Sequence, residues 1–233
     1  MKKQKTFINP DYVESEVDKM AREERERQRS VYHRKNARIR SFWLAIGFAI
    51  TIIDQISKWA VTELYLRPHA RLGESIDFFS WLIETPPAIL SGVGFKVTSN
   101  LNIVMVWNTG VSFGMFSNLG PYMPFILIAV AIFILGFLLF WLFQTHDQTQ
   151  GICCAMIIGG AIGNIIDRAR FGGVIDFIDL HAFEYHWPAF NIADSAIVIG
   201  VGILILQSFV FDVKRKRRYR DRRKERAKRN LGY

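Results

Sequence analysis

Residues 151–180 read GICCAMIIGGAIGNIIDRARFGGVIDFIDL, and this stretch joins a long apolar run to a cluster of charged side chains. Its first part, residues 152–168, is apolar enough to cross most of a membrane as a helix that rises about 1.5 Å per residue. Three other segments are similarly long and apolar: 42–66, 121–143 and 190–211. The sequence therefore predicts four transmembrane helices.

The composition and the distribution of charge agree with a membrane protein. Half of the 233 residues are hydrophobic and 19 are Phe, which argues against a soluble globular domain. The net charge of +9 comes from the two ends, with eight Lys or Arg in residues 22–40 and twelve in residues 214–229. Basic runs beside a membrane span more often set topology and contact anionic lipid than bind nucleic acid. We expect both termini to be cytoplasmic, which four crossings allow.

These features divide the chain into three parts. Residues 1–40 are expected to form a charged cytoplasmic tail, residues 41–211 the transmembrane domain, and residues 212–233 a basic cytoplasmic tail. The outer connection 67–120 contains a segment rich in β-branched and aromatic residues, 95–108, which is typical of strands. The predicted fold is an all-α membrane protein with four transmembrane helices, both termini inside, and a small extracytoplasmic β-rich element.

Polar side chains of three predicted spans fall at one depth when helical rise is counted from the inner end of each span. Asp54 and Lys58 come about 20 and 26 Å from that end, in the first span. Asn164 and Asp167 of the third span come at about 20 and 24 Å, and Asp194 of the fourth at about 26 Å. The polar residues therefore meet in the outer part of the membrane.

Ionisable side chains inside a span usually face the bundle interior and have a partner or a function. Asp54 and Lys58 are four residues apart on one helix face and can pair. Asn164, Asp167 and Arg168 also share a face. These residues can be read either as structural ion pairs between helices or as parts of a site.

Asp176 and Asp194 have no such nearby partner in the sequence, and both are expected at the outer surface. The third and fourth spans are antiparallel neighbours, so the two carboxyl groups can face one another and share one proton. The ionised acid can then take a proton from water while the neutral acid donates a hydrogen bond to a peptide carbonyl. This is aspartic proteolysis, which needs no metal or cofactor. A competing reading makes Asp194 an ordinary helix-start residue, three positions after Asn191.

Four segments resemble, in order, the motif regions of the lipoprotein signal peptidase family, also called signal peptidase II. They are DQISK (54–58), NTGVSFGMF (108–116), GGAIGNIIDRARFGGVIDFIDL (159–180) and HWPAFNIADSAIVIG (186–200). The resemblance runs from about residue 41 to residue 210, and the last two motifs are highly specific.

The resemblance implies an aspartyl endopeptidase of the bacterial inner membrane, with its active site on the outer, periplasmic side. Such an enzyme removes signal peptides from prolipoproteins on the amino side of a diacylglyceryl-modified cysteine. It implies no cofactor, no metal and no nucleic acid; the expected partners are these substrates and membrane lipid, and we expect a monomer.

By motif position, the resemblance puts the catalytic pair on Asp176 and Asp194. The positions that match those shaping the site and holding substrate are Asn108, Asn164, Arg168 and Asn191. The positions that match supporting ones are Asp54, Lys58, Gly160 and Asp167. Two departures leave the shape of the outer β part open: Ser112 stands where the family commonly has a small apolar residue, and the 67–107 connection is longer than typical.

Other classes of protein remain as alternatives. Residues 110–114 satisfy the G-x-S-x-G pattern, and Ser112 with Lys58 could form a serine-type dyad, although no α/β-hydrolase context surrounds them. A small ion-coupled transporter also uses intramembrane charges, but its site usually lies near the midplane between repeats. A non-enzymatic membrane scaffold is a further possibility, with the basic tails as its binding parts.

A metal site is the remaining alternative. The segment DLHAFEYH offers four possible ligands, Asp179, His181, Glu184 and His186, but it lacks an H-E-x-x-H motif. The only cysteines, Cys153 and Cys154, are adjacent and indicate neither a metal site nor a structural disulfide. We expect the four residues of the DLHAFEYH segment to lie at the surface, in a loop.

Overall fold

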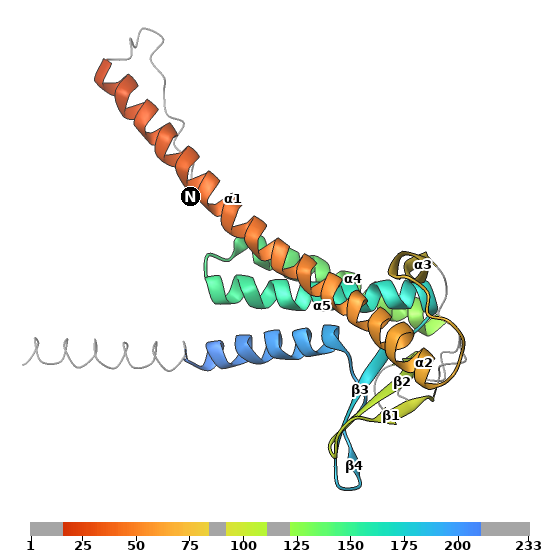
Figure 1. Ribbon diagram of the computed structural model, residues 1–233. Coiled ribbons are helices and arrows are strands. Elements are labelled where there is room, and N and C mark those ends of the chain that lie inside the picture. The colour runs from red at the N-terminus through yellow and green to blue at the C-terminus, as the bar shows by residue number, and fades with distance from the viewer. Residues whose placement is uncertain (1–15, 84–91, 111–121, 211–233) are drawn as a thin grey trace, which may run out of the picture. The chain divides into compact units, whose positions relative to one another are not determined.

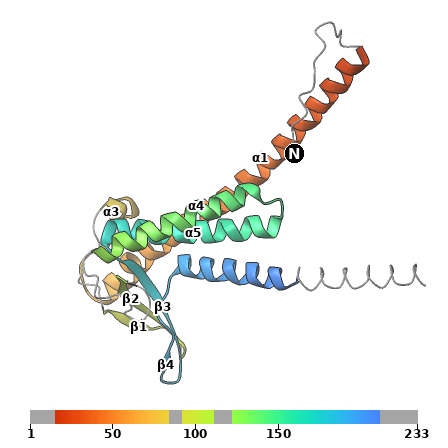
Figure 2. The same ribbon diagram turned by 180° about the vertical axis from the view of Figure 1, so that it is seen from behind.

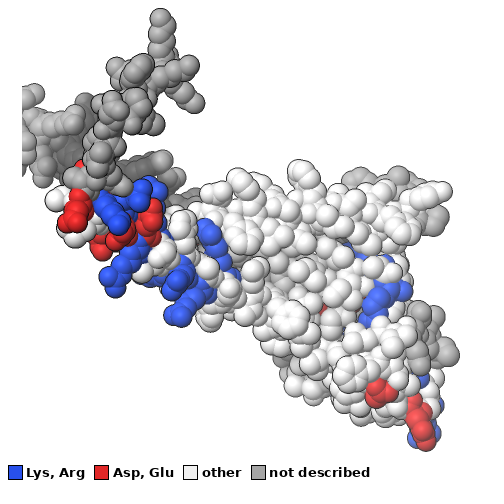
Figure 3. All heavy atoms as spheres, turned by 90° about the horizontal axis from the view of Figure 1, so that it is seen from above, with Lys and Arg blue, Asp and Glu red and all other residues white. Residues whose placement is uncertain are grey.

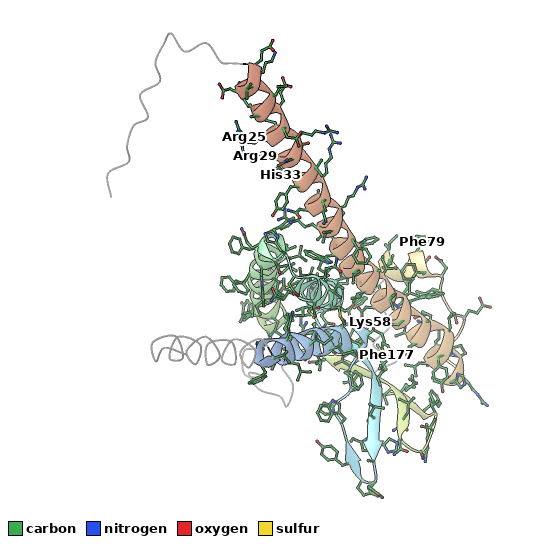
Figure 4. All side chains as sticks on the ribbon, turned by 90° about the vertical axis from the view of Figure 1, so that its left-hand side faces the viewer. Arg25, Arg29, His33, Lys58, Phe79 and Phe177 are labelled. Carbon is green, nitrogen blue, oxygen red and sulfur yellow. The ribbon has the colours of Figure 1, made fainter. Side chains whose placement is uncertain are left out.

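The computed structural model describes residues 16–83, 92–110 and 122–210, and it divides into two compact units, Met1–Phe42 and Trp43–Tyr233 (Figure 1). In the first unit, the described residues form the start of helix α1, Glu16–Trp59. Their side chains are mostly exposed, and Arg25, Arg29 and His33 lie along this helix in Figure 4. Regular helix thus begins within the segment expected as a charged tail.

The second unit is mostly helical. After α1 come a π-helix, η1 (Ala60–Leu66), and the short helices α2 (Arg67–His69) and α3 (Phe78–Ile83). The remaining helices are α4 (Met123–Gln144), α5 (Gln148–Phe171) and a C-terminal helix, Ile192–Val210. Among the described residues, four helices are long and apolar enough to cross a membrane, as expected. Figure 3 shows a wide area of the second unit without charged side chains.

Helix α5 has clear signals at both ends. Asp147 caps its start, because the carboxylate accepts a hydrogen bond from the backbone N–H of Gln150 at 2.9 Å. The helix stops at Gly172, which takes the left-handed conformation with φ 71° that glycine adopts at little cost. Its neighbour α4 begins at a proline in the first turn and runs back beside α5, as Figures 1 and 2 show. The chain therefore turns sharply toward the sheet after α5.

Small residues let other helices approach α5 closely. A Cβ added at Gly159 would overlap the backbone of Gly47 on α1, and the hydroxyl of Thr51 donates to the carbonyl of Gly159 at 2.9 Å. Close backbone approach through glycine is the usual way in which membrane helices pack. Helix α5 is thus held tightly against α1.

The C-terminal helix meets α5 along its whole length. A Cβ at Gly160 would overlap the carbonyl oxygen of Ala193, and one at Gly200 would lie 3.0 Å from the carbonyl oxygen of Cys153. At the far end, Gln207 donates from Nε2 to the carboxylate of Asp147 at 2.9 Å. The contact therefore runs from the first turn of the C-terminal helix almost to its end.

The sheet is antiparallel, with its four strands in chain order: β1 (Gly94–Lys96), β2 (Leu101–Asn108), β3 (Val174–Ala182) and β4 (Tyr185–His186). Strands β1 and β2 lie in the β-rich segment that the sequence predicts. Strand β3 was not expected, because residues 169–189 were interpreted as a short connection. Asp176 and Asp179 disfavour a strand by propensity, but here each accepts a hydrogen bond from an asparagine of β2. Tertiary pairing thus overrides local preference.

A small hydrophobic core holds the sheet beside the end of α5. Its fully buried members come from η1, α3, β2 and β3: Leu66, Trp81, Met105, Ile175 and Phe177. The guanidinium of Arg170, at the end of α5, lies 4.5 Å from the Trp81 ring centre and donates to the Trp81 carbonyl. This packing positions β3 across the ends of α1, α5 and the C-terminal helix.

Candidate active site

A closed ionic cluster lies between α1, α5 and the C-terminal helix. The Nζ of Lys58 is 2.7 Å from Asp54 Oδ2 and 2.7 Å from Asp167 Oδ2, and all three side chains are fully buried. Figure 4 labels Lys58 on the inner side of α1. One cation thus lies between two carboxylates and offsets part of their negative charge, which makes their burial less unfavourable.

Neutral donors complete this cluster. Gln55 donates from Nε2 to Asp167 Oδ1 at 2.9 Å, the backbone N–H of Ala193 donates to Asp54 Oδ1 at 3.0 Å, and that of Ile175 donates to Asp167 Oδ2 at 3.2 Å. The two carboxylates therefore join α1, α5, β3 and the C-terminal helix. The sequence motif DQISK contains Gln55 without indicating its role, although its polar side chain at the depth of Asp54 is a signal of a buried partner.

Asp176 is the third residue of β3 and is 1% exposed. Each of its carboxylate oxygens accepts a hydrogen bond from an asparagine amide: Oδ2 from Asn108 at 3.0 Å and Oδ1 from Asn191 at 2.8 Å. Asn108 is the last residue of β2, so pairing between the two strands brings it to the acid. The strand therefore presents this carboxyl group to the ends of the helices.

Asp194 lies in the first turn of the C-terminal helix and is only partly buried. Its Oδ1 accepts from Asn164 Nδ2 at 2.8 Å, and its Oδ2 accepts from the backbone N–H of Asn191 at 3.3 Å. In return, the backbone N–H of Asp194 donates to Asn191 Oδ1 at 2.9 Å. Asp194 thus takes part in helix capping, as its interpretation as an ordinary helix-start residue predicts. Its carboxyl group nevertheless remains partly accessible.

Asn191 connects the two acids. Its Nδ2 contacts Asp176 Oδ1, Asn164 Oδ1 at 3.3 Å and the carbonyl oxygen of Ile175 at 3.2 Å, while its backbone N–H reaches Asp194. Asn164 in turn lies 3.5 Å from Lys58 Nζ through its Oδ1, which leaves its Nδ2 for Asp194. The two asparagines therefore orient both carboxyl groups and link them to the ionic cluster.

The electrostatic setting of Asp176 differs from that of an ordinary carboxylate. Burial, and then the nearby negative charge of Asp194, raise the pKa of Asp176 to about 7, although hydrogen bonds from Asn108 and Asn191 act in the opposite direction. Among the described residues, no lysine, arginine or histidine forms an ion pair with Asp176 or Asp194. A proton held between such acids is the condition for general acid–base catalysis near neutral pH.

The other predicted residues fall around this pair. Arg168, at the end of α5, is half-buried and donates from Nη1 to the carbonyl of Asn164 at 3.4 Å. Gly160 lies one turn before Asn164, at the closest approach of the C-terminal helix. Every predicted site residue thus lies in the ionic cluster, around the two acids, or in the helix contact beside them.

The described residues of the alternative readings make other contacts. Ser112 falls outside the described residues, and Lys58 is held between two carboxylates. His186 contacts Asp179 at 2.9 Å on the hairpin formed by β3 and β4. Within the three described ranges, no group of three His, Cys, Asp or Glu side chains is placed to hold a metal ion.

Comparisons with known proteins agree on one family. A family model described as "Signal peptidase (SPase) II" matches residues 46–210. A lipoprotein signal peptidase of Syntrophotalea carbinolica is 45% identical over 164 residues, which cover 70% of this chain and 88% of the relative. That of Thermodesulfovibrio yellowstonii is 40% identical over 161 residues, with 69% and 90% covered. A bacterial membrane enzyme solved by the in meso method at 2.3 Å is 27% identical, with a TM-score of 0.56 and 76% and 92% covered.

The fold and these matches define a membrane-embedded protease of the aspartic type. The family match covers well over half of the chain. The chain belongs to the signal peptidase II family, as the sequence motifs predicted, and it is accordingly an aspartic endopeptidase.

Proposed function

We propose that this chain removes signal peptides from prolipoproteins by cutting on the amino side of a diacylglyceryl-modified cysteine, with Asp176 and Asp194 as the catalytic pair. The observation that carries this proposal is the contact of both carboxyl groups with one residue, Asn191, without a cation in an ion pair with either acid in the described part of the chain. The relatives named above are lipoprotein signal peptidases, which supports the substrate.

The proposed mechanism divides the work between the two acids. Near neutral pH the pair holds one proton, and the burial of Asp176 together with its raised pKa of about 7 favours that proton on Asp176. Partly exposed Asp194 is then ionised and takes a proton from a water molecule. The water oxygen attacks the scissile carbonyl carbon while Asp176 donates its proton to the carbonyl oxygen, giving a neutral tetrahedral intermediate.

Collapse of this intermediate completes the reaction. The carbonyl re-forms as Asp176 recovers its proton, and the proton on Asp194 passes to the amide nitrogen. The C–N bond then breaks and releases the amino group of the modified cysteine. The pair returns to its starting state of one proton, so the reaction needs no further acid or base.

Arg168 and the asparagines are proposed to hold the substrate backbone. The Nε of Arg168 is buried and lacks a hydrogen-bond partner among the described residues, so it is available to a peptide carbonyl. An unpartnered buried donor is unfavourable by about 1–3 kcal/mol, and a bound substrate would relieve this. Asn108, Asn164 and Asn191 keep the acids in place while the backbone binds.

The expected placement in the membrane is part of the proposal. The basic runs in residues 22–40 and 214–229 favour cytoplasmic ends, which puts the acids at the outer face of the bacterial inner membrane. Acyl chains on the substrate cysteine lie in the outer leaflet, so the scissile bond lies near this face. We expect a monomer to be sufficient, because all of the proposed site residues come from one chain.

The test is cleavage of a diacylglyceryl-modified prolipoprotein by the purified full chain in lipid vesicles. Asp176→Asn and Asp194→Asn should each lower kcat by about 10³-fold or more, because each removes one half of the acid–base pair. The matched control is Asp179→Asn on the same strand, where the carboxylate faces His186 and Asn102 instead. It should retain activity within about twofold.

Two results would overturn the proposal. Cleavage retained by both asparagine variants would exclude the aspartyl mechanism at these residues. Equal cleavage of the prolipoprotein without its diacylglyceryl group would exclude the proposed substrate class while leaving the catalytic pair intact.

A further inference from the structure

The hairpin of β3 and β4 ends in an exposed group of large apolar side chains. Phe183 at its tip is 97% exposed, Tyr185 is 67% exposed, Trp187 is 59% exposed and Leu180 is 44% exposed. Large apolar side chains that gather, exposed, at one turn indicate a surface that contacts something outside the chain. We call these four residues the hairpin patch.

Strand geometry places three members of the hairpin patch on one face. Ala182 pairs with Tyr185, and the backbone N–H of Trp187 donates to the carbonyl of Leu180 at 2.8 Å. Because side chains alternate between the two sides of a strand, Leu180, Tyr185 and Trp187 point to the same side. Asp176 is four residues before Leu180, so it lies on this side as well.

The opposite face of the hairpin is polar and internally bonded. His181 pairs with His186, and their rings stack with centres 4.8 Å apart. Asp179 accepts from Asn102 Nδ2 at 2.8 Å and contacts His186 Nδ1 at 2.9 Å. The hairpin is therefore amphipathic, with one polar side and one apolar side.

The direction of the apolar side follows from Asp176. Its carboxyl group meets Asn191 at the start of the C-terminal helix, so this side of β3 faces the ends of the helices. Figures 1 and 4 both show the hairpin projecting to one side of the helices, across the direction of α5. In Figures 1 and 2 its tip lies below the start of the C-terminal helix, at a similar position along the direction of α5. The hairpin patch therefore faces the space beside the membrane-spanning helices.

The backbone at the tip gives a second, independent observation. Phe183 has φ 56°, in the left-handed region that glycine and asparagine adopt most readily. A phenylalanine there is unfavourable for the turn, and at 97% exposure its ring contributes almost no burial within the chain. Its apolar ring is therefore explained by a contact beyond the chain.

We propose that the hairpin patch docks into the boundary between headgroups and acyl chains of the bilayer that surrounds the helices. Aromatic residues of the Trp and Tyr type are the ones that favour this boundary, since their rings are apolar and their edges polar. This contact holds the hairpin, and with it β3, against the bilayer from which a membrane-embedded substrate arrives. The proposal rests on the spans and the hairpin geometry, and it does not depend on the catalytic roles of the acids.

The experiment uses the full chain with Cys153→Ala and Cys154→Ala, so that one introduced cysteine carries an environment-sensitive nitrobenzoxadiazole dye. The dye is placed by Phe183→Cys and, as a matched exposed control, by Glu74→Cys in the loop before α3. The purified protein is reconstituted in phosphatidylethanolamine–phosphatidylglycerol vesicles. We expect nitroxide lipids labelled near the headgroup to quench the dye at 183 about threefold more than at 74, and aqueous iodide to show the reverse.

A second variant separates docking from the fold. Tyr185→Ser with Trp187→Ser should lose about half of the lipid quenching at 183, because the rest of the patch is removed. The thermal midpoint should stay unchanged, since both side chains are exposed.

Three outcomes would overturn lipid docking. The first is equal quenching by iodide at 183 and 74. The second is shielding that appears only after the prolipoprotein is added, which would assign the patch to the substrate. The third is shielding that rises with the protein-to-lipid ratio, which would assign it to a second copy of the chain.

Discussion

Two pairs of aspartates lie where β3 meets the helices, Asp54 with Asp167 and Asp176 with Asp194, and they differ in what stands between them. A lysine ammonium lies 2.7 Å from each member of the first pair, whereas in the second pair the side-chain amide of Asn191 donates to Asp176 and its backbone N–H donates to Asp194. A cation between two carboxylates stabilises both in the ionised form. A neutral amide leaves their repulsion in place, and this repulsion favours a shared proton. The comparison separates a pair that holds helices together from a pair equipped for chemistry.

The largest effect should come from removing the cation of the first pair. Lys58→Met leaves two buried carboxylates without compensation, and we expect the free energy of unfolding in detergent to fall by about 3–5 kcal/mol. The control is Asp54→Asn/Lys58→Met/Asp167→Asn, in which the carboxylates are neutralised as well. It should recover most of the loss, and a triple variant as unstable as the single one would contradict the compensation argument.

The second pair should make the free energy of unfolding depend on pH. The raised pKa of Asp176, about 7 against an ordinary 3.8, means that only the folded chain keeps this proton between those values. This contribution to stability is complete below pH 3.8, falls as the pH rises toward 7, and is gone above it.

Asp176→Asn removes that dependence. Between roughly pH 5 and pH 7 the parent should lose about 2 kcal/mol of unfolding free energy relative to this variant. Chemical unfolding of both proteins across this range is the measurement. Parallel curves would show that Asp176 ionises in the folded chain as it does in water.

The contact that joins the two pairs can be tested at Gly160. A Cβ there would overlap the carbonyl oxygen of Ala193, so Gly160→Ala should push the C-terminal helix from α5 and lower stability by about 2 kcal/mol. Gly136→Ala on α4 is the matched control, because its Cβ would meet no atom within 4 Å. If thermal unfolding gave the same midpoint for both variants, the close approach would not be as tight as described.

The smallest effect should distinguish two similar pairs across β2 and β3. Asn108 donates to Asp176 at 3.0 Å and Asn102 donates to Asp179 at 2.8 Å. The bond from Asn108 lowers the pKa of Asp176, so Asn108→Ala should move the alkaline limb of kcat upward by about one pH unit. Asn102→Ala should leave that limb in place, and a shift of equal size in both variants would contradict the assignment.

Much of the fold could be predicted from the sequence, because a long uninterrupted apolar helix has few alternatives in a membrane. Counting helical rise also placed Asp54, Lys58 and Asp167 at one depth, and they do meet. Strand β3 could not be predicted, because an extended segment with two aspartates resembles a loop until its partners on β2 are known. The cytoplasmic placement of both ends remains a prediction.

The details of the site were less visible in the sequence. The two acids were predicted from motif positions, but the role of Asn191 as a bridge depends on the meeting of β3 with a helix that begins 18 residues after β3 starts. The roles of Gln55 and Arg170 could not be predicted, because a single polar residue has no periodic pattern. Their contacts with Asp167 and Trp81 come from the packing of distant segments.

The contact of the C-terminal helix with α5 limits the path by which a substrate can arrive. It is closed at one end by Gly160 against Ala193, and at the other by the hydrogen bond from Gln207 to Asp147. These contacts hold the two helices together near both ends, which disfavours a substrate path between them. Helix α4 buries only three of its side chains, Met123, Leu138 and Leu142. Most side chains of α4 are therefore available to lipid and to a signal helix that lies within the bilayer.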